Sequence, residues 1–430
     1  MNAHPSRRTF LATTLGAAAG VAVLGESTDA RRFATPPNVL VIVLDTVRYD
    51  HFSAGNGSRT PALHRFASRG VRFTNAWAPS SWSLPSHASI LTGAYPHEHG
   101  ADWPTLNLHT ATPTLAETLA GHGYVTGAFS SNGAWVTPNY LSRGFVRFRA
   151  FTWEDHVRRT AYGRTLSRIS EGFGLHPAGR GRKAPTLNEE LLDFVEAYPE
   201  RPFFAYVCHM DANQAYNRAQ LDRPFWAPPP RTADVVSAYD EAIGTLDAQV
   251  GQVLDELDRR GILEHTLVVV TSDHGESFGP DNPGDHDPAG HGTSLFPEQT
   301  RVPLIVVTPD RRHAGLVVDT LVSIKSIPVT LEHLAGLRRR MPGRPLPLPG
   351  VSTPVTDPSV FATLHYAHHR EQALMTSEWL YLRDLAANRE LVFDLRQDPG
   401  ARSALGASHP ALPGLRARVD RVLREGSAAD

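Results

Sequence analysis

The 430-residue sequence contains a single cysteine, Cys208, and its formal net charge is only −2. One cysteine excludes an internal disulfide framework and any zinc knuckle built from cysteine pairs. The near-neutral charge gives no global field that would favour nucleic acid or an anionic membrane, so neither is expected as a partner. No second apolar run of membrane-spanning length follows the N-terminal segment. The composition, with 41% hydrophobic residues, predicts a large globular core.

The N-terminal segment, residues 1–34, has the features of an export signal. Arg7 and Arg8 precede an Ala/Gly-rich apolar run from Leu11 to about Leu24, which is too short for a comfortable membrane span. The Arg-Arg-x-Phe-Leu pattern resembles a twin-arginine signal, which carries folded proteins across the bacterial membrane. We therefore expect an exported bacterial protein, periplasmic or extracellular. A plain signal peptide or a membrane anchor are the alternatives, and any membrane contact is expected through this segment alone.

Alternating strand and helix patterns over residues 36–336 predict one α/β catalytic domain. Continuous apolar runs are typical of strands buried on both faces of a parallel sheet, and apolar residues at helical spacing predict the covering helices. The expected fold is a mostly parallel central sheet sandwiched by helices. The predicted strands are 38–44, 125–129, 203–207, 266–271 and 302–307, and the predicted helices are 60–70, 113–122 and 234–260.

Residues 337–430 predict a smaller C-terminal α+β subdomain joined by a linker. The residue composition changes after Gly336, where three arginines and the proline-rich stretch 342–354 follow. Two short strand patterns follow at 378–383 and 390–395, and a closing helix is expected at 412–423.

Acidic residues follow two of the predicted parallel strands. Asp45 ends the first strand, and Asp273 with His274 ends a later one. Ligands of open parallel sheets bind outside the carboxyl ends of the strands, so these side chains are expected to meet at one edge. Two carboxylates and one imidazole suit Mn, Ca, Mg or Zn. Taken singly, an aspartate at a strand end is more often a turn or cap residue.

Ser83 is predicted to lie at or just before the N-terminus of a helix. Pro85 belongs in a first helical turn, and Gly93 is a natural residue for the C-terminal end. A serine in this place is commonly an N-cap. The same geometry would also stabilise its alkoxide beside a metal, so both interpretations stand together.

These segments, taken in order, resemble the sulfatase family of the alkaline-phosphatase superfamily. Ser-Leu-Pro-Ser-His at 83–87 and the following Leu-Thr-Gly are similar to the sulfatase signature Cys/Ser-x-Pro-x-Arg. The run 38–48 resembles the family's opening strand, 271–276 its second metal segment, 291–304 the part that touches the ester oxygens, and 391–400 its C-terminal turn. The resemblance implies one divalent metal ion held by Asp45, Ser83, Asp273 and His274, with calcium or manganese favoured over magnesium or zinc.

Departures from the family pattern refine this expectation. His87 replaces the signature arginine that directs conversion of the nucleophile to formylglycine, so Ser83 is expected to stay unmodified and attack as a serine alkoxide. Thr46 replaces a second aspartate and His274 an asparagine. This ligand set is closer to the phosphodiester and phosphonate-ester hydrolase and lipoteichoic-acid-synthase branches, which often use manganese.

The resemblance also assigns expected roles around the ester. His87 and His291 are expected to stabilise its oxygens or protonate the leaving group. Asn213 stands where relatives carry a histidine near the leaving group, so it can donate a hydrogen bond but cannot act as an acid. His209 is one place off and should face the other side of its strand. Ser131 and Asn132, just past a strand end, are candidate substrate contacts or simply a turn.

Three functions remain open from the sequence. The first is a hydrolase of sulfate esters, whether small molecules, glycans or lipids. The second is a phosphodiester or phosphonate monoester hydrolase, or a phosphoglycerol-type transferase, using unmodified Ser83. The third, suggested by Asn213, is a catalytically weak binding protein that keeps the metal. The loops 151–185 and 217–231 are expected to set selectivity but carry no readable code, and the oligomeric state is not encoded in any recognisable pattern.

Overall fold

The computed structural model describes residues 35–53, 59–150, 187–213, 231–286, 288–352, 358–406 and 408–426. The predicted export signal and the predicted selectivity loop 151–185 lie outside these residues, as does all of the second loop except Arg231. In the described part of the chain, no helix combines the length and the apolar character that a membrane span requires.

The large sheet has nine strands in the order β4-β3-β5-β1-β6-β7-β2-β8, with β9 paired to β2. At its centre, β1 (Asn38–Leu44) lies between β5 (Phe203–His209) and β6 (Thr266–Thr271) and runs parallel to both. The predicted mostly parallel sheet is confirmed, with one local difference: the predicted strand 302–307 is antiparallel to β6. The other strands are β2 (Val71–Trp77), β3 (Val125–Ser130), β4 (Arg147–Ala150), β7 (Arg301–Val307), β8 (Leu316–Val318) and β9 (Val322–Ser323).

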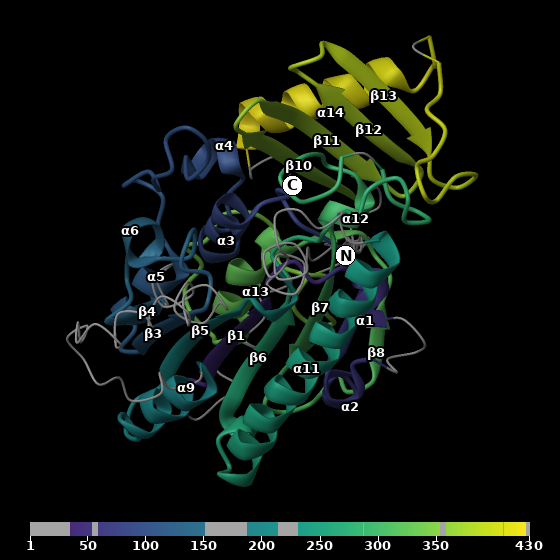
Figure 1. Cartoon of the computed structure of the whole chain (residues 1–430). Helices are drawn as coiled ribbons and strands as arrows, with labels where there is room; N and C mark the ends of the chain where they lie inside the picture. The colour runs from purple at the N-terminus through teal and green to yellow at the C-terminus, as the bar shows by residue number, and fades with distance from the viewer. Residues whose placement is uncertain are drawn as a thin grey trace, which may run out of the picture.

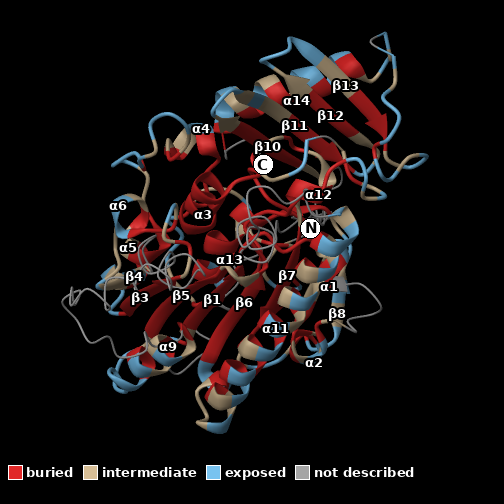
Figure 2. Cartoon of the chain, in the orientation of Figure 1, coloured by how far each residue is buried: buried red, intermediate tan, exposed pale blue. Residues whose placement is uncertain are grey.

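Helices cover both faces of the large sheet, which explains its continuous apolar strands (Figures 1 and 2). Alternate residues of β1 enter two separate apolar clusters, one on each face. Each fully buried aliphatic side chain contributes about 1.5–3 kcal/mol of transfer free energy. One face packs on α2 (Pro61–Ala67), α9 (Leu187–Glu196) and α11 (Thr232–Arg259); the other packs on α3 (Ser83–Thr92), α5 (Leu115–Gly121) and α13 (Ile327–Leu334).

Shorter helical elements complete the large unit. These are α1 (Tyr49–Ser53), α4 (Pro96–His99), α6 (Pro138–Leu141), η3 (Leu263–His265), α12 (Pro297–Thr300) and η4 (Ile324–Ser326).

A four-stranded antiparallel sheet, here called the small sheet, forms the C-terminal part (Figure 1). It consists of β10 (Ser359–Tyr366), β11 (His369–Thr376), β12 (Trp379–Asp384) and β13 (Arg389–Asp394). One face continues the core of the large unit, and the opposite face packs on α14 (Leu412–Glu425). The proline-rich stretch is also packed, because Met341, Leu346 and Leu348 are buried in the same core.

A half-buried glutamate joins the small sheet to the large unit. Glu371 on β11 accepts a hydrogen bond from the backbone N–H of Leu295 at 3.0 Å. Burial, helped by the charge of Asp384, raises the pKa of Glu371 from 4.5 to about 7. The folded state therefore binds this proton more tightly than the unfolded chain. The resulting stabilisation is present below the unfolded value of 4.5 and is lost as the pH rises through about 7.

We therefore expect Glu371→Gln to flatten the fall in melting temperature between pH 4.5 and 7, and to melt above wild type at higher pH. Differential scanning fluorimetry across this range measures the effect. Glu378→Gln, in the turn before β12 and half-exposed, is the matched control and should follow the wild-type curve. A wild-type melting temperature that does not fall relative to Glu371→Gln as the pH rises would refute the assignment.

Candidate active site

The ends of β1 and β6 bring two carboxylates and one imidazole together. Asp45 follows β1, and Asp273 and His274 follow β6, its parallel neighbour, so all three emerge at the same sheet edge. Each offers one ligand atom, and these atoms lie within 4.8 Å of one another. All three residues are fully buried. The structure thus assembles the donor set proposed from the sequence for a cation.

Backbone contacts hold this cluster in place. The Ser272 hydroxyl lies 2.5 Å from the carbonyl oxygen of Leu44 and 2.8 Å from that of His274, and its single proton is shared between them, which ties the two strand ends together. Thr46 adopts a φ of 64°, a strained conformation for a β-branched residue. Its N–H thereby reaches Asp273 Oδ1 at 3.2 Å. The strained turn after β1 therefore orients a carboxylate of the β6 loop.

Ser83 is the first residue of α3, and its hydroxyl points into the same cluster. Trp82 occupies the cap position in an extended conformation, so the predicted N-cap role does not fall to Ser83. Ser83 Oγ lies 3.2 Å from His274 Nε2 and accepts a hydrogen bond from Asn132 Nδ2 at 3.1 Å. Gly93 ends the helix with a φ of 72°, as the sequence predicted.

Two asparagines hold the Asp45 carboxylate, one on each oxygen. Asn132 Nδ2 donates to Oδ2 at 2.7 Å and Asn213 Nδ2 donates to Oδ1 at 3.2 Å. Asn132 therefore contacts both the carboxylate and the Ser83 hydroxyl. Ser131 behaves differently, because its hydroxyl donates to the carbonyl of Cys208 at 3.1 Å. Its proposed contact with substrate stays a prediction.

His87 and His209 lie on opposite sides of β5. His87 on α3 is fully buried, with Nε2 3.1 Å from Asp273 Oδ2 and Nδ1 2.5 Å from the hydroxyl of Tyr206. The structure thus places His87 against the aspartate pair. His209 is separated from that cluster by strand alternation, and its buried Nε2 has no hydrogen-bond partner among the described residues.

His291 stacks at the solvent side of the cluster. Its ring centroid is 4.7 Å from that of His274, and 29% of its side chain is exposed. Nδ1 contacts Glu276 Oε2 at 2.9 Å. Burial acts to lower the pKa of His291, but the charge and hydrogen bond of Glu276 raise it to about 9. Arg48 in turn donates to the Glu276 carbonyl at 3.0 Å and pairs with Asp285, which fixes this loop.

Two atoms that could bind a metal, one on His274 and one on Asp273, direct lone pairs at each other. This arrangement is typical of a cation site. His274 Nδ1 lies 2.9 Å from the carbonyl of Gly275, which can only accept, so Nδ1 carries the proton and Nε2 a lone pair. That lone pair faces Asp273 Oδ2 at 3.3 Å. Asp273 Oδ2 is buried, and its other close polar neighbour among the described residues is His87 Nε2 at 3.1 Å. Two lone pairs at this separation repel unless a cation lies between them.

The charges and pKa values of the cluster also agree with a cation site. Burial, together with the negative charge of Asp273, raises the pKa of Asp45 to about 7. Burial also lowers the pKa of His274 to about 4, which keeps its imidazole in the neutral, ligand form. No lysine or arginine forms an ion pair with Asp45 or Asp273 among the described residues. A divalent ion would compensate this buried charge.

Aromatic side chains surround Trp82, the residue before Ser83. The Trp82 ring lies 5.2 Å from Trp135 and 4.8 Å from Tyr366 on β10. Trp103, 37% exposed, packs 5.9 Å from Tyr366. The small sheet thus contributes a side chain to the surroundings of Ser83, and the Tyr366 ring occupies the space that a side chain at Gly292, beside His291, would need.

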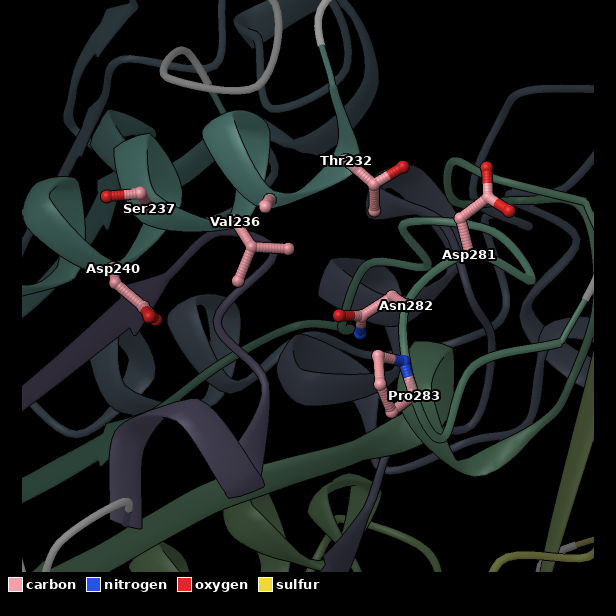
Figure 3. A pocket seen from close by; sticks show the side chains of 8 residues that line it. Thr232, Val236, Ser237, Asp240, Asp281, Asn282 and Pro283 are labelled. Atoms are coloured by element: carbon pink, nitrogen blue, oxygen red, sulfur yellow. The ribbon is translucent and has the colours of Figure 1, made fainter.

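A pocket of about 340 Å³ lies elsewhere, between the first turns of α11 and residues 281–283 (Figure 3). Thr232, Val236, Asp240 and Asp281 are among its lining residues. The Asp240 carboxylate is already paired with His51 at 2.6 Å. This pocket shares no lining residue with the cluster at the sheet edge.

Comparison with known proteins identifies the family. The chain matches the family model described as Sulfatase over residues 37–337, and it therefore belongs to the sulfatase family, with an alkaline-phosphatase-like fold. It is 29% identical over 337 residues to N-acetylgalactosamine-6-sulfatase of Canis lupus familiaris, covering 70% of this chain and 63% of the relative. It is 26% identical over 363 residues to arylsulfatase A of Homo sapiens, covering 75% of this chain and 66% of the relative. The chain thus spans somewhat less than two thirds of these curated relatives.

Solved structures share the fold. The phosphonate monoester hydrolase SpPMH from Silicibacter pomeroyi superposes with a TM-score of 0.69 at 18% identity, covering 90% of this chain and 95% of that chain. The structure of BT1596, described as a 2-O GAG sulfatase, gives a TM-score of 0.67 at 20% identity, covering 91% and 92%. Both similarities concern the fold.

Three residues with no role predicted from the sequence lie beside the cluster in the structure. Glu276 lay within a recognised motif but was given no function, although it holds His291. Tyr206 and Cys208 read only as strand residues, yet both reach His87. Their alternation on β5 is the signal that could have placed them on the face toward the site.

Proposed function

We propose that this protein is a metal-dependent hydrolase of sulfate esters in which Ser83 is the nucleophile. The supporting observation is that the Ser83 hydroxyl lies 3.2 Å from His274 Nε2, beside the buried Asp45–Asp273–His274 donor set. The family membership supports sulfate-ester chemistry, and the names of the curated relatives suggest sulfated glycans or aryl sulfates as substrates.

The residues divide the reaction between them. Ser83 loses its hydroxyl proton to solvent and attacks sulfur in line, so its oxygen forms a bond to sulfur while the bond to the departing alcohol oxygen breaks. Asn132 orients Ser83 and Asp45 together, and Asn213 holds the other Asp45 oxygen. His291 supplies a proton to the leaving oxygen, and His87 supports the donor set through Asp273. Water then attacks sulfur and the bond from sulfur to Ser83 Oγ breaks. One proton of the water restores the Ser83 hydroxyl, the other passes to solvent, and sulfate is released.

The bound divalent ion would supply Lewis-acid stabilisation of the ester oxygens and of the serine alkoxide. Asp45, Asp273 and His274, together with Ser83, would hold it. Calcium or manganese is our first expectation, with magnesium and zinc as alternatives. The export of a folded, metal-loaded protein by the twin-arginine route would fit this requirement.

Ser83 is proposed to act without conversion to formylglycine, because His87 replaces the arginine of the maturation signal. Peptide mass spectrometry tests this directly: the peptide containing Ser83 should have its unmodified mass. A mass shift corresponding to formylglycine would overturn the serine-alkoxide mechanism while favouring sulfatase chemistry.

A second candidate is hydrolysis or transfer at phosphorus, by a phosphodiester or phosphonate monoester hydrolase or a phosphoglycerol-type transferase. The unmodified serine and the His274 ligand favour it. Turnover of an aryl sulfate and a bis-aryl phosphate under a metal titration separates the two. Activity with neither substrate would favour the third candidate, a metal-keeping binding protein whose Asn213 cannot act as an acid.

The aromatic residues beside Ser83 suggest that the substrate alcohol presents a ring. Trp135 is half-buried and meets Trp82 edge to face, so a sugar or aryl ring could pack against it. We expect Trp135→Ala to raise KM for a ring-bearing ester by roughly 3- to 10-fold, with kcat changed less. Steady-state kinetics with aryl sulfate measures this.

The conservative variant Trp135→Phe serves as the control and should recover most of the affinity. An unchanged KM in a folded Trp135→Ala protein would show that the ring does not contact substrate.

A further inference from the structure

Cys208 is a buried thiol that the proposed reaction does not use. Along β5, Tyr206 and Cys208 face one apolar cluster while Val207 faces the other. The Cys208 side therefore faces α3, which carries Ser83 and His87. Cys208 is fully buried.

A second set of ligand atoms meets at this point. Asp45, His87 and Cys208 each offer one donor, and the three atoms lie within 4.8 Å of one another. Cys208 Sγ is 3.8 Å from His87 Nε2. In a tetrahedral zinc site, bonds of about 2.3 Å to sulfur and about 2.0–2.1 Å to nitrogen separate the two ligand atoms by about 3.5 Å. The observed distance between Cys208 Sγ and His87 Nε2 is therefore close to that expected for two ligands of one zinc ion.

The orientation of His87 supports ligation. Its Nδ1 bonds the Tyr206 hydroxyl at 2.5 Å, which fixes the ring and turns Nε2 toward Cys208 and Asp273. Metal-bound histidines usually have their second nitrogen held by such a hydrogen bond. Asp45 has two carboxylate oxygens, so it can face the Asp273–His274 side and the Cys208 side at once.

We propose that this centre has a second metal position, held by Asp45, His87 and Cys208, which takes zinc or a similar transition ion. A donor set of oxygen, nitrogen and sulfur suits zinc, whereas calcium and magnesium prefer oxygen ligands. Asp45 is the ligand shared with the first position. On binding, the Cys208 thiol releases its proton to solvent and the sulfur bonds the ion as thiolate. The alternative is that Cys208 only packs against His87.

Zinc X-ray absorption and metal counting on the full-length protein test this position. The metal-free protein is saturated with Ca²⁺ or Mn²⁺ and then titrated with Zn²⁺ alone. We expect a further zinc equivalent per chain and a sulfur scatterer at about 2.3 Å. The sulfur is diagnostic, because Cys208 is the only cysteine in the sequence.

Variants of the thiol provide the matched comparison. Cys208→Ala should lose the sulfur scatterer and the additional zinc equivalent, while Cys208→Ser retains weaker binding through oxygen. The wild-type absorption measurement stands even if a variant fails to fold. Zinc bound without a sulfur scatterer, or an equal zinc count in folded Cys208→Ala, would overturn the second position.

This inference is distinguishable from the proposed hydrolase. Ester hydrolysis with one metal and no sulfur ligation would refute the second position and leave the hydrolase standing. A zinc–sulfur centre in a protein that cleaves neither sulfate nor phosphate esters would refute the hydrolase and leave the second position standing.

Discussion

Ser83→Ala is expected to lower kcat for ester hydrolysis by about 10³-fold or more, because it removes the oxygen that forms the covalent intermediate. Metal binding should survive, since Asp45, Asp273 and His274 remain in place. Turnover of aryl sulfate and bis-aryl phosphate, with metal content measured in parallel, gives both results. The combination separates loss of the nucleophile from loss of the metal site.

Ser89→Ala is the matched control for this variant. Ser89 lies on the same helix and is equally buried, but its hydroxyl contacts His99 at 3.1 Å. Its loss should cost about 1 kcal/mol of stability and leave kcat within a few-fold of wild type. Undiminished turnover by Ser83→Ala would refute nucleophilic catalysis by this residue.

Asp45→Asn should abolish the response to metal while sparing the metal-free fold. Without a cation, Asp45 and Asp273 are two buried carboxylates within ligand distance of each other, so replacing one with a neutral amide removes their repulsion. We expect the metal-free variant to melt no lower than the metal-free wild type. With Mn²⁺ or Ca²⁺ at 100 times its dissociation constant, wild type should gain about 2.7 kcal/mol and the variant almost nothing.

Calorimetry with chelator and then with added metal measures this contrast, and kcat should fall at least about 10²-fold in the variant. Asp281→Asn is the control, because Asp281 lines the separate pocket near α11 and should retain the full metal-induced stabilisation (Figure 3). A wild-type protein whose melting temperature is the same with and without metal would contradict the cation site.

The central strands and their acidic ends could be predicted because both depend on local pattern. The continuous apolar run 38–44 can be buried only in the middle of a covered sheet, and a parallel neighbour brings Asp273 to the same edge as Asp45. The helix that begins at Ser83 could also be predicted, since Pro85 and Gly93 mark its two ends.

Strands of the small sheet illustrate what the pattern did not reveal. β10 and β11 carry polar residues such as half-buried His365 and exposed Arg370 at their shared end, so they show no clean alternation. Their pairing depends on the core they share with the large unit. β12 and β13 were predicted because their apolar residues stand out more clearly.

Partners within the site could not be predicted from spacing alone. His87 was expected to face the ester oxygens, yet its nearest contacts are Asp273, Tyr206 and Cys208, brought together only when α3 packs on β5. Asn213 was expected to donate a hydrogen bond, and its acceptor here is Asp45.

The most direct test of the central claim is a crystal structure grown with Mn²⁺, using the anomalous signal of manganese to locate it. We predict one anomalous peak within bonding distance of Asp45, Asp273 and His274, with the Ser83 oxygen facing it. A fully occupied manganese elsewhere, with no peak between these four side chains, would contradict the account.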